Sequence, residues 1–242
     1  MSFAGFLPRR SLSVAVVIGS AVGLSGCFDL AQKVAVRHDG SGTYAVEIAA
    51  NGIVGEGLDK KHADIDLDED LHGVTKVTRK GDVTTRTTEA AFHDLSGLKL
   101  GDETLNLHVT GKRDDVTEVN FHRTFHVDHA RRHHDEDDDH MGRDVLESMF
   151  GGHTYTFAVW LPGRIEHIAP VRVANHNVSP IVWGDKYGHT IVWKMKLTDM
   201  FLADALNFDV DFAAKGDFHD AQSQPGVHHG HHHHHDDDDD EG

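Results

Sequence analysis

The last part of the chain concentrates side chains that can bind a metal ion. Histidines are followed directly by carboxylates between residues 228 and 241. Neutral imidazole suits zinc, nickel and copper, and carboxylates can complete a coordination shell. Because this segment is too polar to fold by burying apolar surface, we expect it to bind Zn or Ni in several equivalent arrangements, with no cofactor required. The predicted ligands are His228, His229, His231, His232, His233, His234, His235, Asp236 and Asp237.

Other interpretations of this tail stay open. A cloning tag, solvated low-complexity sequence and a segment that gains positive charge as the medium acidifies would all be rich in histidine. The interrupting Gly230 and the acidic end favour a native segment over a tag.

A second group of candidate metal ligands lies in the polar stretch 129–140. Here His133, His134 and His140 flank a run of carboxylates, and the stretch has almost no apolar side chain to bury. We therefore expect a surface loop that can fold around an ion. On the preceding strand, His126 and Asp128 would share one face about 7 Å apart, although an exposed strand histidine is usually plain polar surface.

Cys27 is the only cysteine, and its surroundings suggest a chemical modification. An apolar run from Leu12 to Leu24 follows the pair Arg9-Arg10, and it is too short to span a bilayer, which is typical of a secretory signal. Leu24-Ser25-Gly26-Cys27 resembles the lipobox of bacterial lipoproteins. The resemblance implies that the signal is cut before Cys27 and that this cysteine carries the acyl chains. The alternative is an ordinary signal peptide that is cut elsewhere and leaves one odd thiol.

Composition narrows the organisation of the mature chain. The formal net charge of -17 disfavours nucleic acid as a partner. With Cys27 used as the anchor, no disulfide can form within the chain, so packing and hydrogen bonds must hold the fold. We expect a signal peptide over residues 1–26, one folded domain over 27–214 and a disordered tail over 215–242.

Alternation of apolar and polar residues predicts strands grouped in hairpins. Short helices are expected at 89–98 and 143–150, and the glycine-containing stretch 52–72 is expected to be a loop with at most one helical turn. The fold class is therefore α+β: a mainly antiparallel sheet with a few short helices on one side. The predicted strands lie within 34–48, 74–88, 105–127, 155–161, 190–197 and 206–212.

The apolar faces of these strands contain aromatic residues. An apolar ligand between the sheet and the helices would contact them, although a core filled by the same side chains is an equal alternative. The residues concerned are Phe121, Phe125, Tyr155, Phe157 and Trp193.

Catalytic motifs are absent from the sequence. It contains no serine elbow, no His-Glu-x-x-His helix and no phosphate-binding glycine loop. The alternate carboxylates from Asp64 to Asp70 begin like a calcium loop, but Glu69 and Thr75 stand where that loop needs Gly and Glu. We therefore expect a protein that is not an enzyme.

The order of several short motifs resembles the LppM-type bacterial lipoprotein domain. These motifs are Asp39-Gly40-Ser41, Leu161-Pro162-Gly163, Asn175, Gly188 and Trp193. The resemblance implies an envelope-exposed α+β domain for which lipid or glycolipid binding has been suggested, with no agreed catalytic residues. Members of the family often continue into a transmembrane helix, whereas this chain continues into its His/Asp tail.

These observations together predict a bacterial cell-envelope lipoprotein. Its lipid anchor would hold it on the cell membrane or the outer membrane, facing the periplasm or the exterior. The domain would bind an apolar or lipid ligand or an envelope partner, while the tail sequesters divalent transition metal. Two alternatives remain: a lipoprotein whose main role is zinc or nickel handling, and a protein-binding accessory subunit of an envelope complex.

Overall fold

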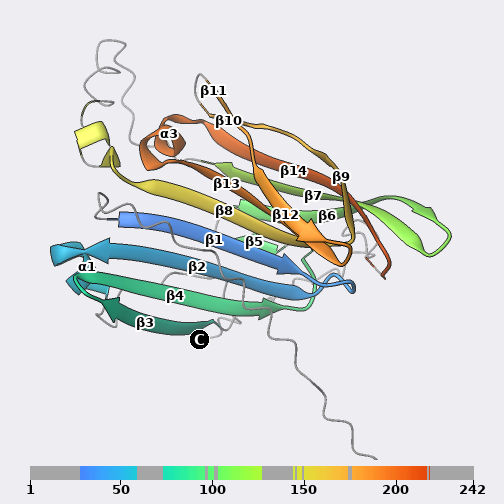
Figure 1. Cartoon of the computed structure of the whole chain (residues 1–242), viewed down its shortest axis with the longest axis horizontal. Helices are drawn as coiled ribbons and strands as arrows, with labels where there is room; N and C mark the ends of the chain where they lie inside the picture. The colour runs from blue at the N-terminus through green and yellow to red at the C-terminus, as the bar shows by residue number, and fades with distance from the viewer. Residues whose placement is uncertain are drawn as a thin grey trace, which may run out of the picture.

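The computed structural model describes residues 28–58, 73–95, 98–100, 103–126, 144, 146–148, 150–173, 176–216 and 218. Within this part, a larger and a smaller sheet account for most of the strands (Figure 1). The strands of the larger sheet are β1 (Phe28–Val36), β2 (Gly42–Asn51), β3 (Val74–Lys80), β4 (Val83–Phe92), β8 (Thr154–Pro162), β12 (Ile181–Asp185) and β13 (Gly188–Lys196). This seven-stranded sheet has the order β12-β13-β8-β1-β2-β4-β3.

The smaller sheet has the order β5-β6-β7-β14-β9, and a separate ribbon pairs β10 with β11. The bounds of these strands are β5 (Leu98–Leu100), β6 (Glu103–Arg113), β7 (Val116–His126), β9 (Arg164–Ile168), β10 (Val171–Val173), β11 (His176–Val178) and β14 (Ala205–Ala214). Short helices complete the described part: α1 (Gly52–Leu58) follows β2, and α3 (Leu197–Leu202) follows β13.

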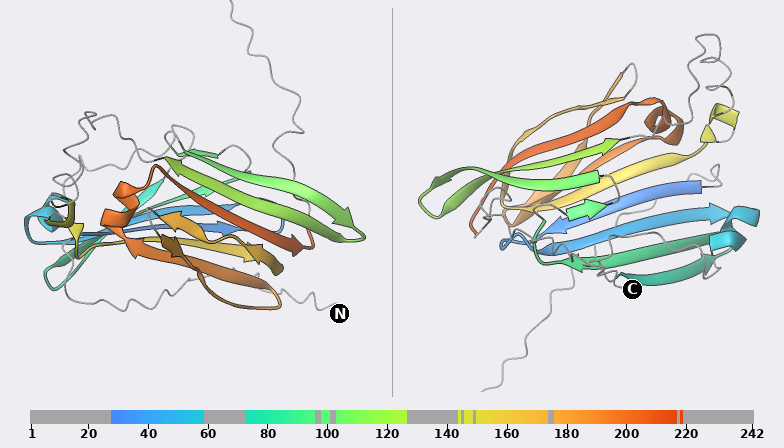
Figure 2. Two further views of the ribbon diagram at one scale, coloured as in Figure 1. Left: turned by 90° about the horizontal axis from the view of Figure 1, so that it is seen from above. Right: turned by 180° about the vertical axis from the view of Figure 1, so that it is seen from behind.

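The two sheets pack face to face and enclose the core between them (Figure 2). Along the central strands of both sheets alternate residues point inward, and the mainly apolar inner faces interdigitate, whereas the edge strands β3 and β12 are exposed along their length. The expected α+β class is therefore correct only in part. The chain is mainly β with short helices, and the layer that covers the larger sheet is a second sheet rather than a group of helices. The largest buried aromatic side chains are Tyr44, Phe121, Tyr155, Phe157, Trp193, Phe208 and Phe212.

The centre of the larger sheet is a parallel pair of strands. β1 pairs with β8 in parallel, from Leu30 opposite Tyr155 to Ala35 opposite Trp160. The other strand pairs in the described part are antiparallel, including the expected hairpin of β1 and β2. A mainly antiparallel sheet built from hairpins was predicted. The parallel pair was not predicted, because it joins segments that lie far apart in the sequence.

One of the two predicted helices is wrong, and the other is supported at its described residues. The described residues 89–95 do not form the helix expected at 89–98: β4 continues to Phe92, where Ala90 and Phe92 pair with Tyr44 and Gly42. The expected burial of Phe92 and Leu95 is nevertheless correct. The helical turn allowed for in 52–72 is α1, and the described residues 146–148 are helical within the helix expected at 143–150.

The hairpin of β6 and β7 confirms the alternation predicted for 105–127 over its described residues. Its turn is formed by Asp114, which has a φ of 56°, and Asp115. Gly111 instead follows a register shift after Val109. The short strands β9 to β12 were not predicted, since none of them is long enough to show a clear period.

Substitution of Phe157 tests whether the contact between the two sheets stabilises the fold. Its ring centroid lies 6.3 Å from that of Phe121, 5.8 Å from that of Trp193 and 4.5 Å from that of Phe208. Phe157→Ala removes contacts to both sheets, so we expect a loss of about 3–5 kcal/mol in the free energy of unfolding, measured by urea denaturation. Thr156→Ala, at the neighbouring outward position, is the control, and an equal loss in both variants would contradict the prediction.

Candidate functional site

The start of β1 is tied to the start of β8, and we call these contacts the anchor junction. The backbone N–H of Phe28 donates to Nδ1 of His153 at 2.9 Å. Oδ1 of Asp29 accepts from both the backbone N–H and the hydroxyl of Thr154, each at 2.8 Å. The junction therefore fixes the residue that directly follows Cys27.

Aromatic rings cover the anchor junction. The His153 ring packs edge-on against Phe28 at 6.4 Å and against Phe150 at 6.2 Å, measured between ring centroids. Phe150 also contacts Phe201 of α3 at 5.2 Å. His153 is itself buried, so the hydrogen bond from Phe28 is shielded from water and costly to lose.

Arg123 is a buried cation between the two sheets. Its side chain is 0% exposed, and Nη2 donates to Oε1 of Gln32 at 2.5 Å. The hydroxyl of Tyr155 donates to the same oxygen at 2.7 Å, and the guanidinium lies 4.5 Å from the centroid of the Phe157 ring. The sequence interpretation missed this residue, although the alternation of β7 places it on the inner face between Phe121 and Phe125.

The aromatic residues proposed to line a ligand site pack against one another instead. Phe121, Tyr155, Phe157 and Trp193 are completely buried, and their rings contact neighbours from both sheets. The two hollows described below lie at the surface. In the described interior these aromatic side chains therefore favour a filled core, the alternative to a ligand site between the sheet and the helices.

The outer face of the smaller sheet carries a row of hydrogen-bonded polar side chains. Nδ1 of His122 lies 2.9 Å from Oδ2 of Asp209, and its Nε2 lies 3.0 Å from the hydroxyl of Thr124. Asn120 donates to Asp209 at 2.6 Å and to Asp211 at 2.9 Å. The order Thr, His, Asp is that of a hydrolase triad, but the threonine hydroxyl donates to Asn207, and the row lies on an open sheet face.

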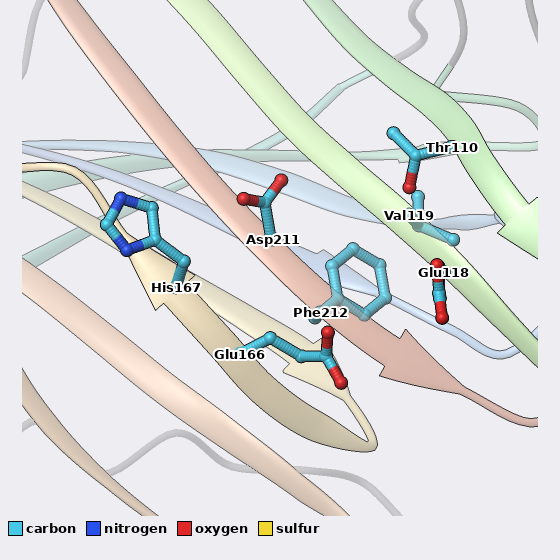
Figure 3. Close-up of a pocket in the computed structure, with 7 residues that line it drawn as sticks. All are labelled: Thr110, Glu118, Val119, Glu166, His167, Asp211 and Phe212. Carbon is cyan, nitrogen blue, oxygen red and sulfur yellow. The ribbon is translucent and has the colours of Figure 1, made fainter.

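An open groove of about 500 Å³ lies at one end of this row (Figure 3). The carboxylate and imidazole side chains that line it come from three strands: Glu118 of β7, Asp211 of β14, and Glu166 and His167 of β9. The apolar residues Val119 and Phe212 also line it. A smaller hollow of about 220 Å³ lies beside the hairpin of β3 and β4. Neither has the enclosed, mostly apolar lining that is typical of a site for a small apolar molecule.

Most of the predicted site residues lie outside the described part of the chain. These are Cys27, the loop residues His133, His134 and His140, and the tail ligands from His228 to Asp237. His126 is described, whereas Asp128 is not. In the part that the structure describes, no group of three or more His, Cys, Asp or Glu side chains is placed to hold a metal ion. None of the described helices is both long and apolar enough to cross a membrane.

The motifs that carried the family resemblance have structural roles. In the turn between β1 and β2, Oδ1 of Asp39 accepts from the hydroxyl of Ser41 at 2.6 Å, and this bond lowers the pKa of the Asp39 carboxyl. Gly40 and Gly163 both have a φ of 78°, which favours glycine in a turn. Trp193 is a buried core residue. Asn175 lies outside the described residues.

A comparison with solved structures gives one similar fold. The chain resembles the folded domain of the Mycobacterium tuberculosis protein LppM, determined by NMR, over 81% of this chain and 95% of that domain, with 11% identity and a TM-score of 0.37. This is the domain type whose resemblance the sequence predicted. No protein-family model and no curated protein matches the chain.

His153→Phe tests the anchor junction, because it keeps an aromatic ring in place and removes the acceptor of the Phe28 N–H. Loss of one shielded hydrogen bond should lower the free energy of unfolding by about 1 kcal/mol and speed amide exchange at Phe28 several-fold. Hydrogen exchange followed by NMR measures this at the residue itself. His176→Phe, at an exposed position, is the control. An unchanged exchange rate at Phe28 in the His153 variant would show that the bond does not hold the strand.

Proposed function

We propose that this protein is a lipid-anchored domain of the bacterial cell envelope that acts by binding at the membrane rather than by catalysis. The observation that carries the proposal is the position of β1. It begins at Phe28, directly after Cys27, and lies inside the larger sheet between β8 and β2. Acyl chains on Cys27 would therefore hold the whole domain at the bilayer surface without a spacer.

The non-enzymatic role is supported by the arrangement of the polar groups. The His122 row and the groove beside it lie on an exposed sheet face, whereas catalytic groups work in sites that exclude water. The filled core favours contact with lipid at the surface over an apolar ligand held between the sheets.

We further propose that the tail gathers divalent transition metal close to the membrane. The support is the composition of residues 228–241, in which imidazoles precede carboxylates. Among the described residues no group of three or more His, Cys, Asp or Glu side chains is placed to hold a metal ion, and the loop with His133, His134 and His140 is the second candidate for uptake.

Cys27→Ala tests the anchor. Because the alanine variant has no thiol to acylate, we expect metabolic labelling with a radioactive fatty acid to drop to background and the signal to remain uncleaved before residue 27. The label and the mass of the N-terminal peptide are the measurements, and Ser25→Ala is the matched control. Acyl label retained by the Cys27 variant would contradict the proposal, whereas membrane association alone would not decide it, since an uncleaved signal can stay inserted.

Zinc titration of the full chain by calorimetry tests whether the tail binds the metal. Zinc must displace protons from imidazole, so binding should be strong near neutral pH and weaken as the pH falls below about 6.5. Replacing the histidines from His228 to His235 with Gln should remove the heat signal, while Asp236→Asn and Asp237→Asn should weaken it only slightly. Calcium should bind poorly to the unchanged chain, since it prefers oxygen ligands. Zinc uptake that survives the Gln replacements would exclude the tail as the main site.

A further inference from the structure

An apolar surface is exposed at one edge of the larger sheet. Ile181 is 64% exposed, Trp183 is 45% exposed, and Tyr187, in the turn to β13, is 65% exposed. Monomeric soluble proteins seldom leave neighbouring large apolar side chains uncovered unless the surface binds something. Edge strands are also commonly protected by charge, yet β12 begins with Ile-Val-Trp.

The register shows that this surface continues over the outer face of the sheet. Trp183 lies opposite Thr190, which lies opposite Trp160 on β8. Opposite residues share a face, so the two tryptophans both point away from the core. The Trp160 ring lies against Gly188, where an added Cβ would come within 2.5 Å of the indole. We call Trp160, Ile181, Trp183 and Tyr187 the aromatic face.

Lysines frame the aromatic face in a chain whose net charge is -17. Nζ of Lys186 lies 4.8 Å from the centroid of the Tyr187 ring, and Lys194 is exposed on the outer side of β13. Asp185 shares this side of the sheet and accepts from the backbone N–H of Tyr187, so the two lysines leave the face with a net positive charge of one. Lys33, farther along the same face, pairs with Glu47 at 2.7 Å and so neutralises a carboxylate there. The outer face of the smaller sheet, by contrast, carries Glu118, Glu166, Asp209 and Asp211.

The aromatic face and the predicted anchor belong to one sheet. Ala35 of β1 is in register with Trp160, and through Thr190 with Trp183. From Phe28, Trp183 therefore lies roughly 23 Å along the strands and roughly 14 Å across them, at ordinary strand spacings. A domain held at Cys27 without a spacer can lay this face on the surface to which it is anchored.

We propose that the aromatic face rests on an anionic phospholipid surface. The indole and phenol rings would enter the interfacial region, as Trp and Tyr do at membrane interfaces, and the ammonium groups of Lys186 and Lys194 would meet lipid phosphates. The acidic outer face of the smaller sheet would then point away from the bilayer. This proposal rests on the proposed anchoring at Cys27, and it adds the surface and the orientation by which the domain meets the lipid.

The experiment uses the lipidated chain, purified from membranes and reconstituted into vesicles of phosphatidylcholine with or without phosphatidylglycerol. Brominated phosphatidylglycerol should quench tryptophan fluorescence. Trp183→Phe should reduce that quenching and leave a smaller part that comes from Trp160, since Trp193 is buried. A chain that begins at Phe28, and so keeps all the described strands without an acyl chain, is tested in parallel by sedimentation with the same vesicles. A fold check by circular dichroism accompanies each variant.

Matched variants separate insertion of the apolar side chains from attraction between the lysines and the lipid phosphates. Ile181→Ser with Trp183→Ser should weaken sedimentation of the unlipidated chain by about tenfold or more, because apolar insertion and charge act together. The control is Val77→Ser, an equally polar change at an exposed position whose side chain lies on the inner side of the far edge strand. Lys186→Glu with Lys194→Glu should weaken binding only to vesicles that contain phosphatidylglycerol, and Lys112→Glu on the other sheet is the control for charge.

Three outcomes would overturn the proposal. The first is quenching and sedimentation that do not change in the Trp183 variants. The second is a dimer seen by analytical ultracentrifugation that needs Trp183 and does not bind vesicles, which would make the face a contact between two copies of the chain. The third is Trp183-dependent binding of a protein in place of vesicles. Absence of acyl chains on Cys27 would contradict the anchoring alone, since the unlipidated chain still reports whether the face binds lipid.

Discussion

The contact between the two sheets depends on how the charge of Arg123 is held in an apolar interior. Placing an isolated cation there is costly, so the guanidinium needs both hydrogen-bond acceptors and polarisable neighbours. Gln32 of β1 supplies an acceptor at 2.5 Å, and the face of Phe157 on β8 lies 4.5 Å away. Both partners come from the parallel pair at the centre of the larger sheet, whereas Arg123 belongs to the smaller one. The network thereby fixes how the sheets sit on each other.

Local patterns predicted local structure well. Alternation identified the β1–β2 and β6–β7 hairpins. Arg123 falls on the apolar face of β7 by the same alternation, but a charged residue was not expected there and the prediction missed it. The helix expected at 89–98 failed because the spacing of Phe92 and Leu95 fits a helix turn, yet pairing with β2 extends β4 to Phe92. The second sheet and the parallel pair could not be predicted from periodicity. An alternating strand shows that one of its faces is buried, but it does not show which other element packs against that face.

The candidate sites also divide into those with a local sequence signal and those formed by residues far apart in the sequence. A lipobox is a local signal, so Cys27 could be predicted, and the composition of the tail likewise indicated metal ligands. The aromatic face was missed because its residues lie on β12, on the turn after it and on β8, and only the register brings Trp160 and Trp183 onto one surface. The Ile-Val-Trp run before Gly184 did carry a strand signal in its β-branched and aromatic residues.

The placement of β1 also bears on the order of events in the envelope. Phe28 is held by His153, a partner 125 residues later in the chain, and β1 completes the larger sheet only when β8 is present. Contacts of such sequence separation form late, after the loop between them has closed. Until β8 has been synthesised, Phe28 lacks both its acceptor on His153 and the neighbouring strand, so the start of β1 is not yet fixed. The proposed lipidation of Cys27 therefore does not require the folded larger sheet, and the folded sheet adds no spacer between the proposed anchor and β1.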